Sequence, residues 1–204
     1  LDNFCWPDPI ESEKTPDGKF KLAQLVRANR ELERVCRAYR LPCVSGKDSM
    51  KNDYGVWPNK ISIPPTMLFS LFGNHADVRN TATSNFKQHG QRIYLVGNCK
   101  NELGASEVAY HLTERNLTEG IGGNVPRLPE PERQLDIYRR LSKTIQDGLI
   151  RTAHDCSEGG LAVAVAEMCI GGRLGAIIDI DGIGEGDAFS RLWSESLGRI
   201  VVAV

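Results

Sequence analysis

The stretch HDCSEGG, residues 154–160, gathers small polar side chains and two glycines immediately before an apolar segment. Asp155 and Ser157 are two residues apart, so in an extended segment their side chains share one face. One of them can then ligate Mg²⁺ while the other hydrogen-bonds a phosphate oxygen, and the start of the following helix adds a positive dipole. The alternative is a helix N-cap, in which Ser157 or Asp155 accepts hydrogen bonds from free backbone N–H groups. The residues alone leave these two functions equally open.

A second polar stretch, SGKDSM at residues 45–50, follows a short predicted strand at 42–44, as phosphate-binding loops do. A Walker A motif is absent, because Leu41 stands where that motif requires its first glycine. Lys47 can meet a phosphate as a point charge. The residues by themselves nevertheless favour a tight turn with a solvated lysine.

Two further groups have weaker chemical content. His154 is a candidate general base, but a single histidine more often serves as a structural hydrogen-bond donor. Glu195 and Ser196 precede the last predicted strand, where a Glu–Ser pair can bind substrate hydroxyls but more often forms a solvated turn. The six cysteines include no C-x-x-C pair, so a zinc site is not indicated, and we expect most of them to be reduced thiols packed in the core.

The composition is that of a globular protein rather than of a membrane or nucleic-acid-binding one. Apolar residues make up 41% and charged residues 25% of the chain, which is typical of a globular protein. Its 204 residues are enough to bury a core. The 25 basic side chains nearly balance the 26 acidic ones, so no global field favours nucleic acid or an anionic membrane surface. No apolar run approaches the roughly 20 residues that a membrane span needs, and we expect no signal peptide. Because the chain begins at Leu1 without a Met, we expect it to be part of a longer polypeptide.

The elements that position these residues follow from hydrophobic periodicity and from breaker residues. Residues 1–20 are rich in Pro, Asp and Gly and predict a loop. Apolar residues at spacings of three and four predict a helix over 21–40. The strand predicted at 60–73 contains two consecutive prolines, which suit an edge or a bulge rather than a central strand.

Strands alternate with helices in the second part of the chain, which predicts an α/β class with mixed sheets. A polar, turn-rich segment at 74–91 indicates a domain boundary near residue 84, giving domains 1–83 and 84–204. The predicted strands of the second domain are 92–97, 176–180 and 199–204, and its predicted helices are 106–115, 131–148, the apolar segment after HDCSEGG and a short helix near 189–193.

Six stretches occur in one order along the chain: LDNFCWPDP, PCVSGKDSMKNDY, KISIPPTMLFS, NELGASE, AHDCSEGGLAVAVAEM and LWSESLGRIVVAV. Together they resemble the phosphoribosylformylglycinamidine synthase family of the aminoimidazole ribonucleotide (AIR) synthetase-like superfamily. The resemblance covers essentially the whole chain, and HDCSEGGLA and SGKDSM are its most specific parts. It implies that residues 1–83 are the C-terminal part of a second amino-terminal-type domain, which forms a barrel and grasps ATP. Residues 84–204 would be the second carboxy-terminal-type domain.

The resemblance implies an ATP-dependent carbon–nitrogen ligase of cytoplasmic purine biosynthesis. ATP would phosphorylate the formamide oxygen of formylglycinamide ribonucleotide, and ammonia drawn from glutamine would displace phosphate to give the amidine. The implied cofactors are ATP or ADP and Mg²⁺. The implied partners are a glutaminase domain or subunit that supplies ammonia and the remaining synthetase domains. We also expect a homodimer to form through strand edges of the partial N-terminal sheet.

Matching the family's motifs residue by residue assigns binding functions. Gly46 would contact the nucleotide through its backbone, Lys47 would meet a phosphate, and Ser49 matches a substrate-binding position. Asp155 matches a Mg²⁺ ligand and nucleotide contact, and Ser157 matches a nucleotide contact. The short form of the family has an Asn metal ligand where this chain has Lys47, so the short form's metal site does not transfer. No catalytic residue is assigned, and the chain is not expected to turn over alone.

Two alternatives stay open. The chain would be a non-catalytic scaffold, holding a structural nucleotide or none, if Lys47, Asp155 and Ser157 do not converge on one cleft. The second alternative is a different ATPase of the same superfamily, of the hydrogenase-maturation or selenophosphate type, although we do not expect those proteins to share LDNFCWP or SGKDSM.

Overall fold

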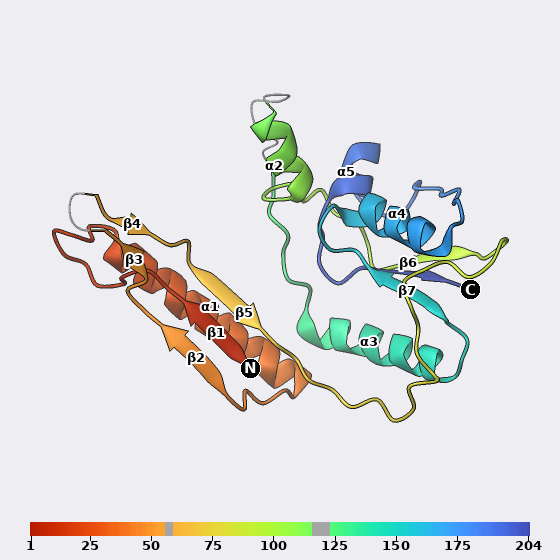
Figure 1. Cartoon of the computed structure of the whole chain (residues 1–204), viewed down its shortest axis with the longest axis horizontal. Coiled ribbons are helices and arrows are strands. Elements are labelled where there is room, and N and C mark those ends of the chain that lie inside the picture. Colours follow the sequence, from red (N-terminus) through yellow and green to blue (C-terminus); the bar gives the residue numbers. More distant parts are fainter. Residues whose placement is uncertain (56–58, 116–122) are drawn as a thin grey trace. The chain divides into compact units, whose positions relative to one another are not determined.

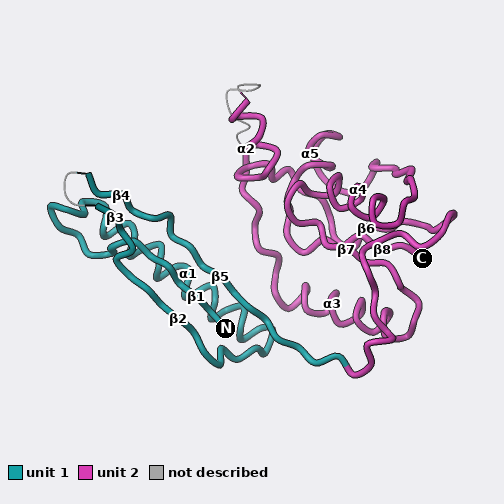
Figure 2. Tube along the Cα trace, in the orientation of Figure 1, with its two compact units in different colours: residues 1–75 teal, residues 76–204 magenta. Residues whose placement is uncertain are grey.

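The computed structural model describes residues 1–55, 59–115 and 123–204. The chain folds into two compact units, Leu1–His75 and Ala76–Val204 (Figure 2). In the described residues, unit 1 combines one helix with two small sheets and unit 2 combines four helices with one small sheet (Figure 1), which confirms the predicted α/β class with mixed sheets. The units divide between residues 75 and 76, whereas the family-domain boundary predicted near residue 84 stays a prediction.

The main sheet of unit 1 has the strand order β2-β1-β5, with β1 at Asp2–Cys5, β2 at Gly46–Ser49 and β5 at Thr66–Phe69. β1 pairs in parallel with β2 and antiparallel with β5, so it is the central strand. The prediction of a loop over residues 1–20 was wrong for β1. This strand depends on two partners far along the chain, and the polar residues around it indicate neither of them.

The strand predicted at 42–44 was also wrong. Those residues form no strand, and β2 begins instead at Gly46, inside the SGKDSM stretch. The prediction of a tight turn in that stretch was wrong because pairing with β1 keeps it extended. Residues 60–73 form β4 (Ile61–Ser62) and β5 on either side of two prolines, as predicted. β4 pairs with β3 (Asp53–Tyr54) in a separate two-stranded sheet.

The helix predicted at 21–40 is confirmed as α1, Gly18–Tyr39. Its first turn is tied to the chain after β1 through Trp6, which is 4% exposed. The indole N–H of Trp6 donates to the carbonyl oxygen of Lys21 at 2.9 Å. A buried aromatic ring with a satisfied polar group therefore fixes the helix against the sheet.

The outer edges of β2 and β5 pair with no strand in the described residues, as predicted for the partial sheet. Apolar side chains in and beside β5 are exposed, including Leu68 at 59%, Leu71 at 77% and Phe72 at 81%. Unpaired strand edges with apolar neighbours favour association with another chain. A homodimer formed through this sheet stays a prediction.

The sheet of unit 2 has the order β6-β8-β7, with β6 at Ile93–Val96, β7 at Thr152–Asp155 and β8 at Ile200–Ala203. Both pairings are antiparallel, and the strands predicted at 92–97 and 199–204 are confirmed. Helix α4, Gly160–Gly172, covers one face of this sheet (Figure 1). Their contact forms the core, whose buried members are Phe86, Cys156, Leu161, Ala164, Val165, Met168, Val201 and Ala203.

The remaining helices described in unit 2 confirm the predicted ones: α2 at Glu107–Glu114, α3 at Pro131–Gln146 and α5 at Ala188–Trp193. Ser106 and Asp187 cap the starts of α2 and α5 through their side chains. Among the helices that the structure describes, none has the length and apolar character needed to cross a membrane.

The strand predicted at 176–180 was wrong, because this segment pairs with no strand among the residues that the structure describes. Its burial still alternates as in a strand, since Ile178 and Ile180 pack against the core while Ile177 is fully exposed. A cavity of about 910 Å³ lies between this segment and β6. The local pattern therefore correctly predicted which side chains face the core. It could not show that no described strand lies beside this segment to pair with it.

Candidate functional site

Residues 156–159 connect β7 to α4 in a tight turn, in which the Gly160 N–H donates to Ser157 O at 3.0 Å. Gly159 and Gly160 have φ angles of 75° and 64°, a left-handed backbone that favours glycine. A side chain on Gly160 would also overlap the carbonyl oxygen of Ser194, at the end of α5. Both the backbone conformation and the close approach of α5 therefore require the glycines of the HDCSEGG stretch.

Glu195 binds the backbone at the start of α4. Its Oε1 accepts a hydrogen bond from the Gly159 N–H at 2.9 Å and another from the Glu107 N–H, at the start of α2, at 2.8 Å. One carboxylate therefore stabilises the positive ends of two helices. The N-cap alternative for Ser157 or Asp155 was wrong, because the cap residue is Gly159 and no side chain of its own accepts the capping bond.

The prediction of a solvated turn at Glu195 and Ser196 was wrong as well. Ser196 is 1% exposed, and its Oγ accepts a hydrogen bond from the Lys100 N–H at 3.1 Å. The sequence signal was a Glu–Ser pair directly before a buried strand. The groups that bind the pair are far away in the chain, so spacing alone could not identify them.

The Asp155 carboxylate is open to solvent, with its side chain 68% exposed. Ser157 Oγ donates a hydrogen bond to Asp155 Oδ2. This hydrogen bond holds the pKa of Asp155 below its usual range, and partial burial opposes it only in part. The two side chains meet, as their spacing predicted, and present an ionised carboxylate and a hydroxyl on one surface.

His154 is held between β7 and α4. Its Nε2 lies 2.9 Å from Glu167 Oε2, and its Nδ1 lies 2.8 Å from the carbonyl oxygen of Asp155. Its side chain is only 19% exposed. Because both ring nitrogens contact oxygens of the protein, the arrangement favours the structural role over the general base.

A hollow of about 580 Å³ opens beside Asp155 and has Arg199 in its wall. Arg199 is 2% exposed, and its guanidinium donates to Ser194 O, to Ser196 O at 2.9 Å and to Cys99 Sγ at 3.0 Å. In the part of the chain that the structure describes, these bonds include no carboxylate. Asp155, Glu158 and Glu195 also line the hollow, so a buried positive charge and three carboxylates meet there, which suits a phosphate together with a cation.

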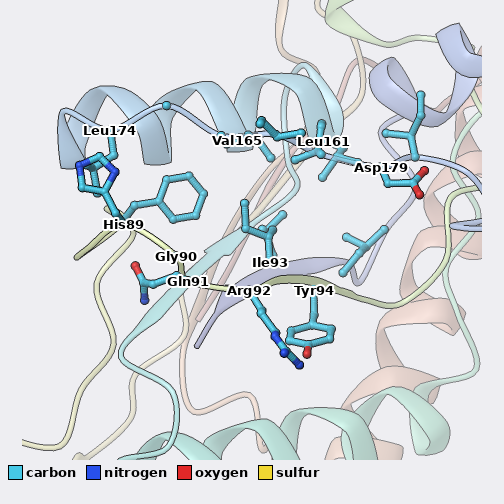
Figure 3. A pocket seen from close by; sticks show the side chains of 18 of the residues that line it. His89, Gly90, Gln91, Arg92, Ile93, Tyr94, Leu161, Val165, Leu174 and Asp179 are labelled. Atoms are coloured by element: carbon cyan, nitrogen blue, oxygen red, sulfur yellow. The ribbon is translucent and has the colours of Figure 1, made fainter.

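A larger cavity, of about 910 Å³, lies between α4 and β6 (Figure 3). Apolar side chains dominate its lining, among them Ile93, Leu161 and Val165, and Asp179 lies at its edge. Its polar side chains, those of Gln88, His89, Gln91, Arg92, Tyr94 and Asp179, are fewer than its apolar ones, so the cavity suits an apolar group better than a charged ligand. We therefore assign the candidate site to the smaller hollow beside Asp155 and attribute the larger cavity to an incompletely filled core.

Three of the predicted residues lie on β2 in unit 1. Gly46 approaches Asp2 so closely that an added Cβ would lie 2.8 Å from Asp2 Cγ. Lys47 and Ser49 are two residues apart and so share one face of the strand. The Lys47 side chain is exposed and makes no hydrogen bond or ion pair with the described residues. Ser49 Oγ accepts a hydrogen bond from Asn52 Nδ2 at 2.9 Å.

The predicted residues therefore form two sets. Asp155 and Ser157 contact each other in unit 2, and Lys47 and Ser49 share a face of β2 in unit 1. The convergence of the two sets on one cleft stays a prediction.

Asp155 fits Mg²⁺ as a single exposed and ionised carboxylate. Among the described residues, no three His, Cys, Asp or Glu side chains gather as a metal site. Mg²⁺ is commonly held by one or two carboxylates, with phosphate oxygens and water completing its coordination. The side chains present suit a phosphate-bound magnesium better than an ion held by the protein alone.

Known proteins match the chain over most of its length. Residues 88–204 match the family model described as AIR synthase related protein, C-terminal domain. The chain is 35% identical over 190 residues to the phosphoribosylformylglycinamidine synthase subunit PurL of Parafrankia sp., and 33% identical over 195 residues to that of Thermus thermophilus. These alignments cover 93% and 96% of the chain but 23% and 24% of the relatives. The chain thus spans about a quarter of the length of the curated relatives it matches.

Solved structures of PurL from Thermotoga maritima share the fold. The structure described as complexed with FGAR gives a TM-score of 0.63 at 17% identity and covers 100% of this chain and 30% of that one. The structure described as complexed with ATP gives 0.57 at 15% identity, with coverages of 100% and 29%. At such identities the likeness establishes the fold alone. Through residues 88–204, more than half of its length, the chain belongs to the AIR synthase related protein family.

Proposed function

We propose that the chain forms part of an ATP-dependent carbon–nitrogen ligase of the phosphoribosylformylglycinamidine synthase type. Relatives at 35% and 33% identity carry that name, and structures of the same fold are described as complexes with FGAR, ATP and ADP. The enzyme converts formylglycinamide ribonucleotide, glutamine and ATP to formylglycinamidine ribonucleotide in the cytoplasm. A glutaminase domain or subunit supplies the ammonia, and the remaining synthetase domains complete the active site.

The observation that carries this proposal is the exposed, ionised Asp155 at the mouth of a hollow with buried Arg199 in its wall. Asp155 holds Mg²⁺, which when bound neutralises phosphate charge and favours phosphoryl transfer. The Ser157 hydroxyl, which donates to Asp155 Oδ2 in this structure, would instead donate to a phosphate oxygen. Arg199 lies in the wall of the hollow, and its positive charge attracts the polyphosphate.

The contacts assigned to unit 1 lie along β2. Gly46 brings its backbone close to the nucleotide, because it has no side chain in the way. Lys47 meets a phosphate as a point charge, which its exposed and unbonded side chain supports. Ser49 contacts formylglycinamide ribonucleotide, and to do so it exchanges its hydrogen bond with Asn52 for one with the substrate.

A scaffold with a structural nucleotide is the second candidate function, and Glu195 is the observation that favours it. Its carboxylate already accepts hydrogen bonds from the backbone at the starts of α2 and α4. A phosphate at this site would therefore gain less from the start of α4 than at a helix whose first N–H groups are free. Neither function assigns proton transfer to a residue of this chain.

Calorimetric titration of Mg²⁺·ADP into the chain and into Asp155→Asn tests the proposal. We expect the native chain to bind and the variant to bind at least about tenfold more weakly, which corresponds to ~1.4 kcal/mol of lost interaction. Asp181→Asn is the matched control, because the Asp181 side chain is 94% exposed and does not line the hollow. Equal binding by the native chain and Asp155→Asn would mean that the nucleotide binds at a site that does not include Asp155. No binding by the native chain would favour a scaffold without a nucleotide of its own.

A further inference from the structure

Two cysteine thiols meet at the end of α1, at positions to which the proposed function assigns no role. Cys36 Sγ lies 3.8 Å from Cys43 Sγ. Cys43 is exposed and Cys36 is partly buried, whereas Cys99 and Cys156 are buried in unit 2. A pair of accessible thiols in contact differs from the reduced core cysteines that the sequence predicts, because each sulfur is within reach of the other and of solvent.

The backbone between the two cysteines brings them together. Arg40 has φ 56° and ψ 41°, the left-handed conformation that ends α1, and the Leu41 N–H donates to the carbonyl oxygen of Cys36 at 3.0 Å. Pro42 then restricts the chain immediately before Cys43. The helix-ending motif therefore turns the chain so that Cys43 lies beside the last turn of α1.

A surface hollow of about 610 Å³ is lined by both cysteines and by two arginines, Arg37 and Arg40. The Arg37 guanidinium donates to Glu33 at 2.8 Å, while Arg40 is exposed. Guanidinium groups attract carboxylates through charge-assisted hydrogen bonds. The hollow therefore suits a small reagent that carries both a sulfur and carboxylates.

We propose that Cys36 and Cys43 form a reversible disulfide by exchange with a small anionic disulfide, for which glutathione disulfide is the probe. The exposed Cys43 reacts first: its thiolate attacks one sulfur of the reagent, the reagent's S–S bond breaks, and one glutathione leaves as a thiolate that takes up a proton. The Cys36 thiolate then attacks the Cys43 sulfur of the mixed disulfide, and the second glutathione leaves in the same way. The net reaction oxidises two protein thiols to one disulfide and reduces one glutathione disulfide to two thiols.

The order of the two steps follows from the surroundings of each sulfur. Thiolates that are open to solvent react first with external reagents. Burial, followed by the contact with Cys43, raises the pKa of the Cys36 thiol, which lowers its reactivity toward external reagents. Its sulfur lies 3.8 Å from Cys43 Sγ, so the second step is intramolecular. The resulting bond would tie the last turn of α1 to the segment that enters β2.

The test incubates the full chain with graded ratios of reduced and oxidised glutathione, followed by alkylation and peptide mass spectrometry. We expect Cys36 and Cys43 to lose alkylation together as one linked peptide pair, and to regain it in excess reduced glutathione. In Cys36→Ser we expect a stable glutathione adduct on Cys43, because the second step is removed. Cys5→Ser is the matched control within unit 1 and should leave the pairing unchanged.

A stable adduct on Cys43 of the native chain, without a linked pair, would overturn the proposal. So would linked pairs that join other cysteines as readily. A second arm replaces the anionic reagent by cystamine, a cationic disulfide. We expect the native chain to react several-fold faster with glutathione disulfide and Arg40→Gln to lose most of that preference, whereas equal rates in the native chain would refute the anionic reagent.

Discussion

Replacing Gly160 by alanine probes the packing at the start of α4, on which the candidate site depends. Gly160 has φ 64°, and an added Cβ would overlap the carbonyl oxygen of Ser194 and lie 2.9 Å from that of Leu192. The left-handed backbone costs alanine about 1–2 kcal/mol. Overlap with fixed backbone atoms adds about 1–3 kcal/mol, and the reduced entropy of the unfolded chain offsets about 0.4–1 kcal/mol. We expect Gly160→Ala to lower the free energy of unfolding of unit 2 by about 1–5 kcal/mol.

Two other glycines separate these contributions. Gly182 has φ 78° but no atom within 4 Å of an added Cβ, so Gly182→Ala isolates the backbone contribution, about 1 kcal/mol after the entropy offset. Gly175 has neither a positive φ nor a neighbour within 4 Å. Gly175→Ala should therefore be neutral or slightly stabilising.

Hydrogen exchange of the β8 amides, Ile200–Ala203, reports the stability of unit 2 separately from unit 1. Protection should fall in the order Gly175→Ala, Gly182→Ala, Gly160→Ala. If Gly160→Ala lowers protection no more than Gly182→Ala does, then the end of α5 does not contact the start of α4. The account of the HDCSEGG glycines would then be wrong.

Three further predictions concern residues in or beside the candidate site: Glu195, Ser157 and Cys156. Glu195→Ala leaves two helix-starting N–H groups without their acceptor and should lower the free energy of unfolding in urea by about 1–3 kcal/mol, whereas Glu195→Gln, which keeps an oxygen acceptor, should lose less. Because the hydrogen bond from Ser157 lowers the pKa of Asp155, the stability from that carboxylate is present above its ordinary pKa and is lost as pH falls through the lower folded-state value. Ser157→Ala should shift the NMR titration of Asp155 to higher pH, and an unshifted titration would contradict this. Burial raises the pKa of the Cys156 thiol from 9.0 to about 11. The stability that the protonated thiol contributes is therefore fully present below pH 9.0 and is lost as pH rises through about 11. Cys156→Ala should remove that alkaline loss from pH-dependent unfolding, and an unchanged loss would assign it to another group.

The helices could be predicted from the sequence because their signals are local. Apolar spacing predicted α1 and α3, and the breakers around them set their ends within a few residues. The strands depended on partners that a local pattern does not reveal. β1 lies in a segment rich in turn residues but is held by strands on both sides, while 176–180 has a strand-like alternation and pairs with nothing described.

In the candidate site, too, local contacts could be predicted from the sequence and contacts between elements could not. The contact of Asp155 with Ser157 followed from their spacing of two residues. Arg199 was missed, and Glu195 was considered only for substrate hydroxyls or a solvated turn. The backbone groups and the thiol that these two residues bind come from turns and helix ends elsewhere in the chain. Sequence spacing predicts contacts within one element, whereas contacts between elements require the fold.

The most direct test of the central claim is to map backbone amide shifts by NMR during titration of the whole chain with Mg²⁺·ADP. We expect the largest shifts in unit 2 at residues 155–160 and a response of Lys47 and its neighbours on β2 in unit 1. Shifts concentrated around the apolar cavity between α4 and β6, with residues 155–160 unchanged, would contradict the assignment of the nucleotide site.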